Sequence, residues 1–263
     1  MGSKFDTANY LGPIGTSCLP SDAWLRFPER MRPSTFIRFA KLRCGLLSTP
    51  ARLVRGRAPA PPCRAGCAQP ATLGHILQKC SHTHDARCRR HNEVMNAIAQ
   101  QVQSPHTEVM VEPIVPHGST FMKPDLIIVR GSVAYVADVT ISSPTNVEPA
   151  YANKVEKYGN PEALASIKLY LSSRYPTVTD VKQTPVVITS NGLLHRKSDK
   201  ILENLGLRKH HRASLCYKAM LGSLVCYDIY MRGIPERSTP IVDNSDGVGP
   251  LQSSFPHFSS FIL

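Results

Sequence analysis

The sequence predicts an α/β fold preceded by a small metal-binding module. Two dense apolar runs, at 126–129 and 133–141, are rich in β-branched residues and are separated by a short Gly-containing break, so we expect a strand hairpin. A third run, at 185–189, adds a strand, and helical patterns lie between and after the three. Cys and His residues are densest at 63–91, where apolar residues are too few to form a core unaided.

The first 62 residues are rich in Pro, Arg and Gly and are expected to form a basic linker. One short helix is expected within it, over 36–43, with Ser34 as its N-cap.

Further helices are indicated by apolar residues spaced three or four apart, by Pro near the first position and by Gly or Pro near the end. They are expected over about 91–103, 149–158, 160–175, 198–206 and 212–231. Residues 233–263 return to Pro, Ser and Gly without periodicity, which predicts a poorly ordered tail.

The length of 263 residues suits one domain of ordinary size plus a smaller module. A composition of 42% hydrophobic and 19% charged residues favours a folded protein over a disordered one. No apolar run approaches the length needed to span a bilayer, and the first residues lack the apolar centre of a secretory signal. We therefore expect an intracellular protein without a membrane partner.

The positive charge is concentrated in the first third of the chain. Residues 1–92 hold 15 Lys and Arg against 4 Asp and Glu, whereas the remainder holds 16 against 15. Such asymmetry is typical of a surface that meets phosphates, although a solvated basic tail is the alternative.

Eight cysteines at uneven spacing in an intracellular chain favour metal binding over a disulfide framework. Cys63, Cys67, His75 and Cys80 offer three thiolates and one imidazole, which is the number and type of ligands that a closed structural zinc site requires. The competing set replaces His75 by His84, and Cys88, His82 and His91 allow further permutations. Ordinary buried thiols and surface imidazoles are the alternative to any metal site.

Basic residues surround this cluster and indicate nucleic acid as its partner. They are Arg52, Arg55, Arg57, Arg64 and Lys79 before or within it, and Arg87, Arg89 and Arg90 after it.

Two aspartates flank the predicted hairpin: Asp125 precedes its first strand, and Asp138 lies within its second. A hairpin of this size can bring both carboxylates to one end, where a divalent cation such as magnesium would compensate their charge. Such an ion activates water and stabilises charge on a phosphate, while a nearby lysine, Lys154 or Lys157, orients the nucleophile. Lys154 shares a helix face with Tyr158. Purely structural aspartates remain the alternative.

The order of several motifs is similar to the C-terminal region of site-specific non-LTR retrotransposon proteins, which insert into ribosomal RNA genes. The resemblance covers about residues 30 to 210. It is carried by Cys63-Arg64-Ala65-Gly66-Cys67, His75-Ile76-Leu77-Gln78-Lys79-Cys80, Arg90-His91-Asn92, Lys123-Pro124-Asp125, Val136-Ala137-Asp138 and Lys154-Val155-Glu156-Lys157-Tyr158-Gly159-Asn160.

The resemblance implies a CCHC zinc knuckle over 63–90 and a restriction-endonuclease-like domain of the PD-(D/E)XK type over 91–232, with a mixed central sheet flanked by helices. Such proteins nick target DNA in the nucleus so that the exposed end primes reverse transcription of the element's RNA. No reverse-transcriptase domain or its Tyr/Phe-Ala-Asp-Asp motif is present in this sequence. A catalytically inactive nucleic-acid-binding fragment is therefore the alternative function.

The resemblance also implies roles for individual residues. Cys63, Cys67, His75 and Cys80 match the zinc ligands, Asp125 and Asp138 the catalytic acidic pair that holds magnesium, Lys154 the catalytic lysine, and Tyr158 a nearby catalytic-site position. Arg90 and His91 match an Arg-His pair at the start of the nuclease domain, for which contact with DNA and a structural role are both open. Contact with DNA is also expected for the basic residues Arg55, Arg57, Arg64 and Arg87.

Overall fold

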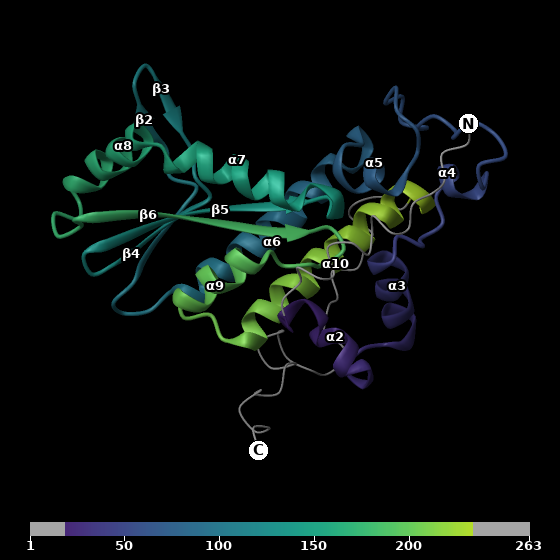
Figure 1. Cartoon of the computed structure of the whole chain (residues 1–263), viewed down its shortest axis with the longest axis horizontal. Coiled ribbons are helices and arrows are strands. Elements are labelled where there is room, and N and C mark those ends of the chain that lie inside the picture. Colours follow the sequence, from purple (N-terminus) through teal and green to yellow (C-terminus); the bar gives the residue numbers. More distant parts are fainter. Residues whose placement is uncertain (1–18, 234–263) are drawn as a thin grey trace.

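The structure, a computed structural model, describes residues 19–233 (Figure 1). The expected tail over 233–263 lies outside the described residues, apart from Gly233. The helices are η2 (Leu19–Asp22), α2 (Ala23–Arg26), η3 (Pro28–Arg30), α3 (Pro33–Arg43), α4 (Pro50–Leu53), α5 (Leu73–Gln78), η4 (Ser81–Thr83), α6 (His84–Val102), η5 (Pro144–Asn146), α7 (Val147–Gly159), α8 (Pro161–Ser172), α9 (Arg196–Asn204) and α10 (Lys209–Arg232). The strands are β1 (Glu108–Val111), β2 (Val115–His117), β3 (Thr120–Met122), β4 (Leu126–Arg130), β5 (Val133–Ser142) and β6 (Asp180–Thr189).

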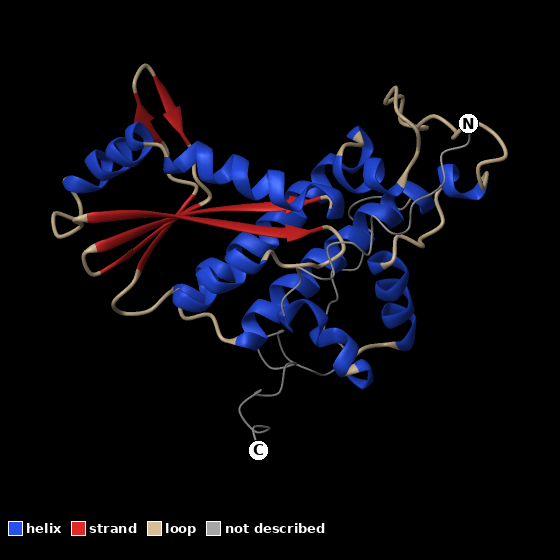
Figure 2. Ribbon diagram, viewed as in Figure 1, coloured by secondary structure: helices blue, strands red, loops and turns tan. Residues whose placement is uncertain are grey.

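Four strands form one mixed sheet in the order β1-β4-β5-β6. The predicted hairpin is confirmed, because β4 and β5 pair antiparallel from Arg130↔Val133 to Leu126↔Ala137. β6 then pairs parallel to β5, and α7 and α8 form the crossover between them. The sheet is flanked by helices (Figure 2), which confirms the expected α/β class.

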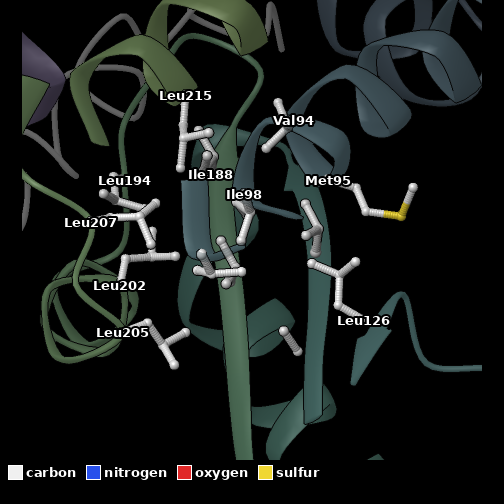
Figure 3. Close-up of a cluster of buried hydrophobic side chains, with 14 of the residues drawn as sticks. Val94, Met95, Ile98, Leu126, Ile188, Leu194, Leu202, Leu205, Leu207 and Leu215 are labelled. Carbon is white, nitrogen blue, oxygen red and sulfur yellow. The ribbon is translucent and has the colours of Figure 1, made fainter. Parts of the chain in front are cut away.

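Both faces of the sheet are covered, which explains why its central strands are apolar throughout. On one face, α6, α9 and α10 pack a core that includes Val94, Ile98, Leu202 and Leu215 (Figure 3). On the other face, Tyr158 of α7 and Ile167 and Leu171 of α8 cover β4 and β5.

Residues 19–51 pack against the rest of the fold, although the sequence favours a linker there. Trp24, Phe39 and Leu42 are buried against α10 in a second core that also includes Cys63 and Cys80. Arg38 pairs with Asp228 of α10 at 2.6 Å. This segment is therefore folded because its scattered apolar residues meet a partner helix about 180 residues away.

Several element boundaries differ from the expected ones. Ser34 is not the N-cap of α3: Pro33 takes the first helical position, and the capping residue Arg32 makes no side-chain bond. α6 starts at His84, so the expected boundary between 90 and 91 falls inside one continuous helix. β6 begins at Asp180, earlier than expected, and its polar first half extends along β5.

Candidate active site and metal centre

Cys63, Cys67, His75 and Cys80 converge, with their potential ligand atoms all within 4.8 Å of one another. The loop 63–67 supplies two thiols, and α5 supplies His75. Cys80 follows Lys79, the residue that caps the end of α5. The Sγ atom of Cys80 lies 3.6 Å from that of Cys63 and 4.0 Å from that of Cys67. Thiolates at about 2.3 Å from a tetrahedral zinc ion would be about 3.8 Å apart, so the spacing fits zinc.

The surroundings of His75 suit a ligand imidazole. Its Nδ1 lies 3.1 Å from Oε1 of Gln69, which fixes the ring orientation, while its buried Nε2 has no hydrogen-bond partner among residues 19–233. Burial lowers the pKa of His75, followed by smaller effects of Arg87 and Lys79, which keeps the imidazole neutral. Histidine binds metal as a neutral imidazole, and its other ring nitrogen is commonly hydrogen-bonded to a group such as the side-chain carbonyl of Gln69.

Ser81 supports the thiol of Cys67 and was not singled out from the sequence. Its hydroxyl lies 3.2 Å from Sγ of Cys67 and its backbone N–H donates to the same sulfur at 3.4 Å. These hydrogen bonds lower the pKa of Cys67 to about 7, whereas burial raises the pKa of Cys80 to about 11. The competing ligand His84 instead lies on the surface, with Nε2 3.7 Å from Sγ of Cys88.

Asp125 and Asp138 lie at the end of the β4–β5 hairpin that is opposite its turn. Asp125 immediately precedes β4, and its Oδ2 accepts the backbone N–H of Val139 at 2.6 Å. Asp138, adjacent to Val139 on β5, is only 4% exposed. The expected convergence of the two carboxylates follows from the register, because β4 begins opposite Ala137.

Lys154 of α7 forms an ion pair with Oδ2 of Asp138. The other candidate, Lys157, instead lies over the Tyr158 ring, 4.6 Å from its centroid. The hydroxyl of Tyr158 donates to the backbone carbonyl of Lys123 at 3.2 Å. Burial, and then the negative charge of Asp138, raise the pKa of Tyr158, so this phenol stays protonated.

His91 joins this site from α6. Its Nε2 lies 3.1 Å from Oδ2 of Asp125 and 3.1 Å from the carbonyl of Val139. The hydrogen bond to Asp125 raises the pKa of His91 to about 9, so the ring is protonated at neutral pH. His91 therefore orients Asp125, and its contact with DNA stays a prediction.

The two carboxylates suit an oxygen-preferring divalent cation. Magnesium is commonly held by one or two protein carboxylates, with water and substrate phosphates completing its shell. Asp125 and Asp138 would therefore be the protein ligands.

The basic residues expected to contact DNA fall into two groups. Arg55, Arg57 and Arg64 are exposed around the metal cluster, and the Arg64 guanidinium lies 4.7 Å from the centroid of the Tyr230 ring. Arg87 is half-buried and donates to the carbonyls of Gln78 at 2.7 Å and Cys80 at 3.2 Å, so it also braces the metal cluster.

Arg90 is a correction to the expected DNA-contacting set. It is 2% exposed, and it donates from Nη1 to Oγ of Ser223 at 2.8 Å and from Nη2 to the carbonyl of Leu77 at 3.0 Å. A Cβ atom on Gly222 would lie 2.5 Å from Cγ of Arg90, so the helices pack closely here. Arg90 therefore joins α5, α6 and α10 and is not available to phosphates.

Arg90→Leu and Arg57→Ala are expected to have opposite effects. The first removes a buried charge together with its hydrogen bonds to Ser223 and to the Leu77 carbonyl, which should destabilise the fold by about 3 kcal/mol. The second removes an exposed cation, which should leave stability unchanged and reduce the salt dependence of DNA binding by about one ion. Urea unfolding and DNA titrations at several salt concentrations measure both. A loss of affinity without a loss of stability in Arg90→Leu would contradict the assignment.

His91→Gln tests whether this ring orients Asp125. Second-sphere partners of metal ligands contribute about 10- to 100-fold in activity, so we expect a loss of nicking rate of that size with unchanged DNA affinity. The exposed His106, replaced in the same way, is the control. Loss of DNA affinity in His91→Gln at an unchanged rate in saturating DNA would instead favour direct contact with DNA.

The chain is similar to several known proteins, although no protein-family model matches it. It is 31% identical over 216 residues to the Retrovirus-related Pol polyprotein from type-2 retrotransposable element R2DM of Drosophila melanogaster, a match that covers 81% of this chain and 20% of that protein. It is 30% identical over 241 residues to a Retrovirus-related Pol polyprotein from type-1 retrotransposable element R2 of Popillia japonica, covering 89% of this chain and 48% of that protein. A polyprotein of the same description from Nasonia vitripennis is 26% identical over 217 residues, covering 81% and 21%.

The matches cover about four fifths or more of this chain, and the chain spans between a fifth and a half of the length of each relative. Over most of its length, the chain is therefore homologous to the Pol polyproteins of R2 non-LTR retrotransposable elements.

Proposed function

We propose that this chain is a magnesium-dependent DNA endonuclease with a restriction-endonuclease-like core, in which a structural zinc ion holds the module at 63–90. The proposal is supported by two contacts: Asp125 accepts the N–H of Val139, next to Asp138, and Lys154 pairs with Asp138. Two carboxylates and an ammonium group beside them are the groups that phosphodiester hydrolysis requires.

Each residue has a distinct task in this proposal. Asp125 and Asp138 would hold magnesium, which when bound activates water and neutralises charge on the phosphate. Lys154, held against Asp138, positions the attacking water and stabilises negative charge that develops on the phosphate. Tyr158, buried and bonded to the Lys123 carbonyl, fixes α7 against the segment that carries Asp125.

The proposed substrate is chromosomal DNA in the nucleus, with a ribosomal RNA gene as the target. A nick there would expose an end that primes reverse transcription of the element's RNA by a polymerase domain. The exposed Arg55, Arg57 and Arg64 around the metal cluster would neutralise phosphates of the target, and element RNA would compete for the same surface.

A second function is supported by the same basic residues: a nucleic-acid-binding module that does not cut by itself. Supercoiled plasmid separates the two functions. We expect nicking by the purified chain with magnesium, and none after EDTA treatment with DNA binding retained. Binding without nicking in magnesium would favour the second function, and nicking in EDTA would exclude the metal mechanism.

A further inference from the structure

A cavity of about 270 Å³ lies between the metal-binding module and the end of β5. Three separate segments line it: residues 45–52 including α4, the start of α5 at 72–74, and the 143–145 loop that follows β5. In Figure 1, α4 and α5 lie beyond the end of the sheet at which the β5 arrow terminates. The cavity therefore exists only because the module is packed against the catalytic domain.

The walls of the cavity combine apolar and polar surface. Leu47, Ala51 and Leu73 present buried apolar side chains on one side. On the other, the hydroxyls of Ser143 and Thr145 lie 2.8 Å apart on an exposed loop, where each can bond to a ligand. A flat heteroaromatic ring has an apolar face and polar edges, which is the pattern these walls would accept.

The cavity lies in line with the proposed catalytic site. β5 is continuous from Asp138 to Ser142, and Ser143 follows directly, so the distance along the strand is about 17 Å at 3.4 Å per residue. β4 begins opposite Ala137, so among the described residues no strand pairs with 138–142 on that side. A few nucleotides of DNA would span this distance between the phosphate that is cut at Asp138 and the cavity.

One cation, Arg52, lies among the residues that line the cavity, and two more follow α4 in the sequence. Arg52 lines it, and one of its guanidinium nitrogens donates to the carbonyl of Gly45 at 3.4 Å, which leaves further N–H groups for a phosphate. Arg55 and Arg57 are exposed in the turn just after α4. The charge of this wall is therefore complementary to a nucleic-acid backbone.

We propose that this cavity binds one unpaired nucleotide of the target strand, a few nucleotides from the phosphate that is cut. The base packs against Leu47 and Leu73, and Arg52 binds its phosphate. The base must be unpaired, because a cavity of this size admits one nucleotide and not a base pair. The inference rests on the proposed function. It implies that the cavity between the two modules keeps the DNA strands separated next to the nick.

Gly74 offers a selective way to block the cavity. It lines the cavity, and an added Cβ atom would meet nothing within 4 Å. Gly74→Phe would therefore fill the cavity without straining the backbone, whereas the matched control Gly74→Ala leaves it open and should favour the helix. Thr145→Trp blocks the cavity from the opposite wall. It replaces Gly74→Phe in the test if Gly74→Phe binds less zinc or has a lower Tm.

The experiment compares affinity for two fluorescein-labelled duplexes, one fully paired and one with a short central run of T·T mismatches. All variants carry Asp138→Asn so that the DNA stays intact, and binding is measured without magnesium. The parent chain and Gly74→Ala should prefer the mismatched duplex by about tenfold, as expected for one base packed on an apolar wall, and Gly74→Phe should lose this preference.

The same preference in Gly74→Phe and in Thr145→Trp, or no preference in the parent chain, would overturn the nucleotide site. Because the readout is binding to uncut DNA, it is independent of nuclease activity. A chain that shows the preference and never nicks plasmid retains this site and loses the proposed catalytic function.

Discussion

Asp138→Asn is expected to lower the rate of plasmid nicking by about a thousandfold or more while DNA affinity and the fold are retained. Asn has nearly the same shape as Asp, so the buried position, 4% exposed, stays filled. The substitution removes the negative charge that pairs with Lys154 and that would bind magnesium. Water near the phosphate then loses both its activating cation and its oriented lysine.

The matched control is Asp180→Asn, the same change on an exposed carboxylate at the start of β6, where Asp180 pairs with Lys182. It should nick plasmid at the parent rate. Nicking, DNA titration and thermal unfolding of the three proteins measure rate, affinity and stability separately. Parent-like nicking by Asp138→Asn would disprove the catalytic assignment, whereas an equal loss in both variants would point to charge in general and not to this site.

The strands and the convergence of the acidic residues were predictable because their signals are local. The runs at 126–129 and 133–141 have few polar residues, and their break holds Gly131 at φ 60°, so a hairpin is almost the only arrangement open to them. The hairpin register then places Asp125 beside Asp138. β1, by contrast, was missed because Glu108–Val111 alternates weakly and is half-exposed at the sheet edge.

The arrangement around the metal cluster was not predictable in the same way. Trp24 and Phe39 are widely spaced in a Pro- and Arg-rich segment, and only the presence of α10 turns them into a core. Arg90 carries the same charge as Arg57. Arg90 is nevertheless buried and donates a hydrogen bond to Ser223, 133 positions away, whereas Arg57 is exposed. Spacing along the chain identifies ligands and hairpins, but it does not identify which charged side chains lie beneath a distant helix.

The zinc site is expected to control the stability of the whole described fold. Cys63 and Cys80 belong to a core that includes Leu224 and Tyr230 of α10, and the same helix supplies Leu215 to the core against the sheet. Loss of the metal would therefore loosen both cores at once. Structural zinc contributes folding free energy directly, so Cys80→Ala should cost at least about 4 kcal/mol.

Thermal unfolding of Cys80→Ala should show a single transition with a Tm lowered by about 10 °C or more, since each kcal/mol shifts the Tm of a domain of this size by about 2–4 °C. The control Cys88→Ser alters an exposed thiol that lies beside His84 and outside the cluster, and it should unfold like the parent. Bound metal, measured per chain, should fall from one zinc to none in Cys80→Ala only. Two separate transitions, with the later one unchanged, would mean that the metal-binding module folds independently, and α10 would then be stabilised by its contacts with the sheet side alone.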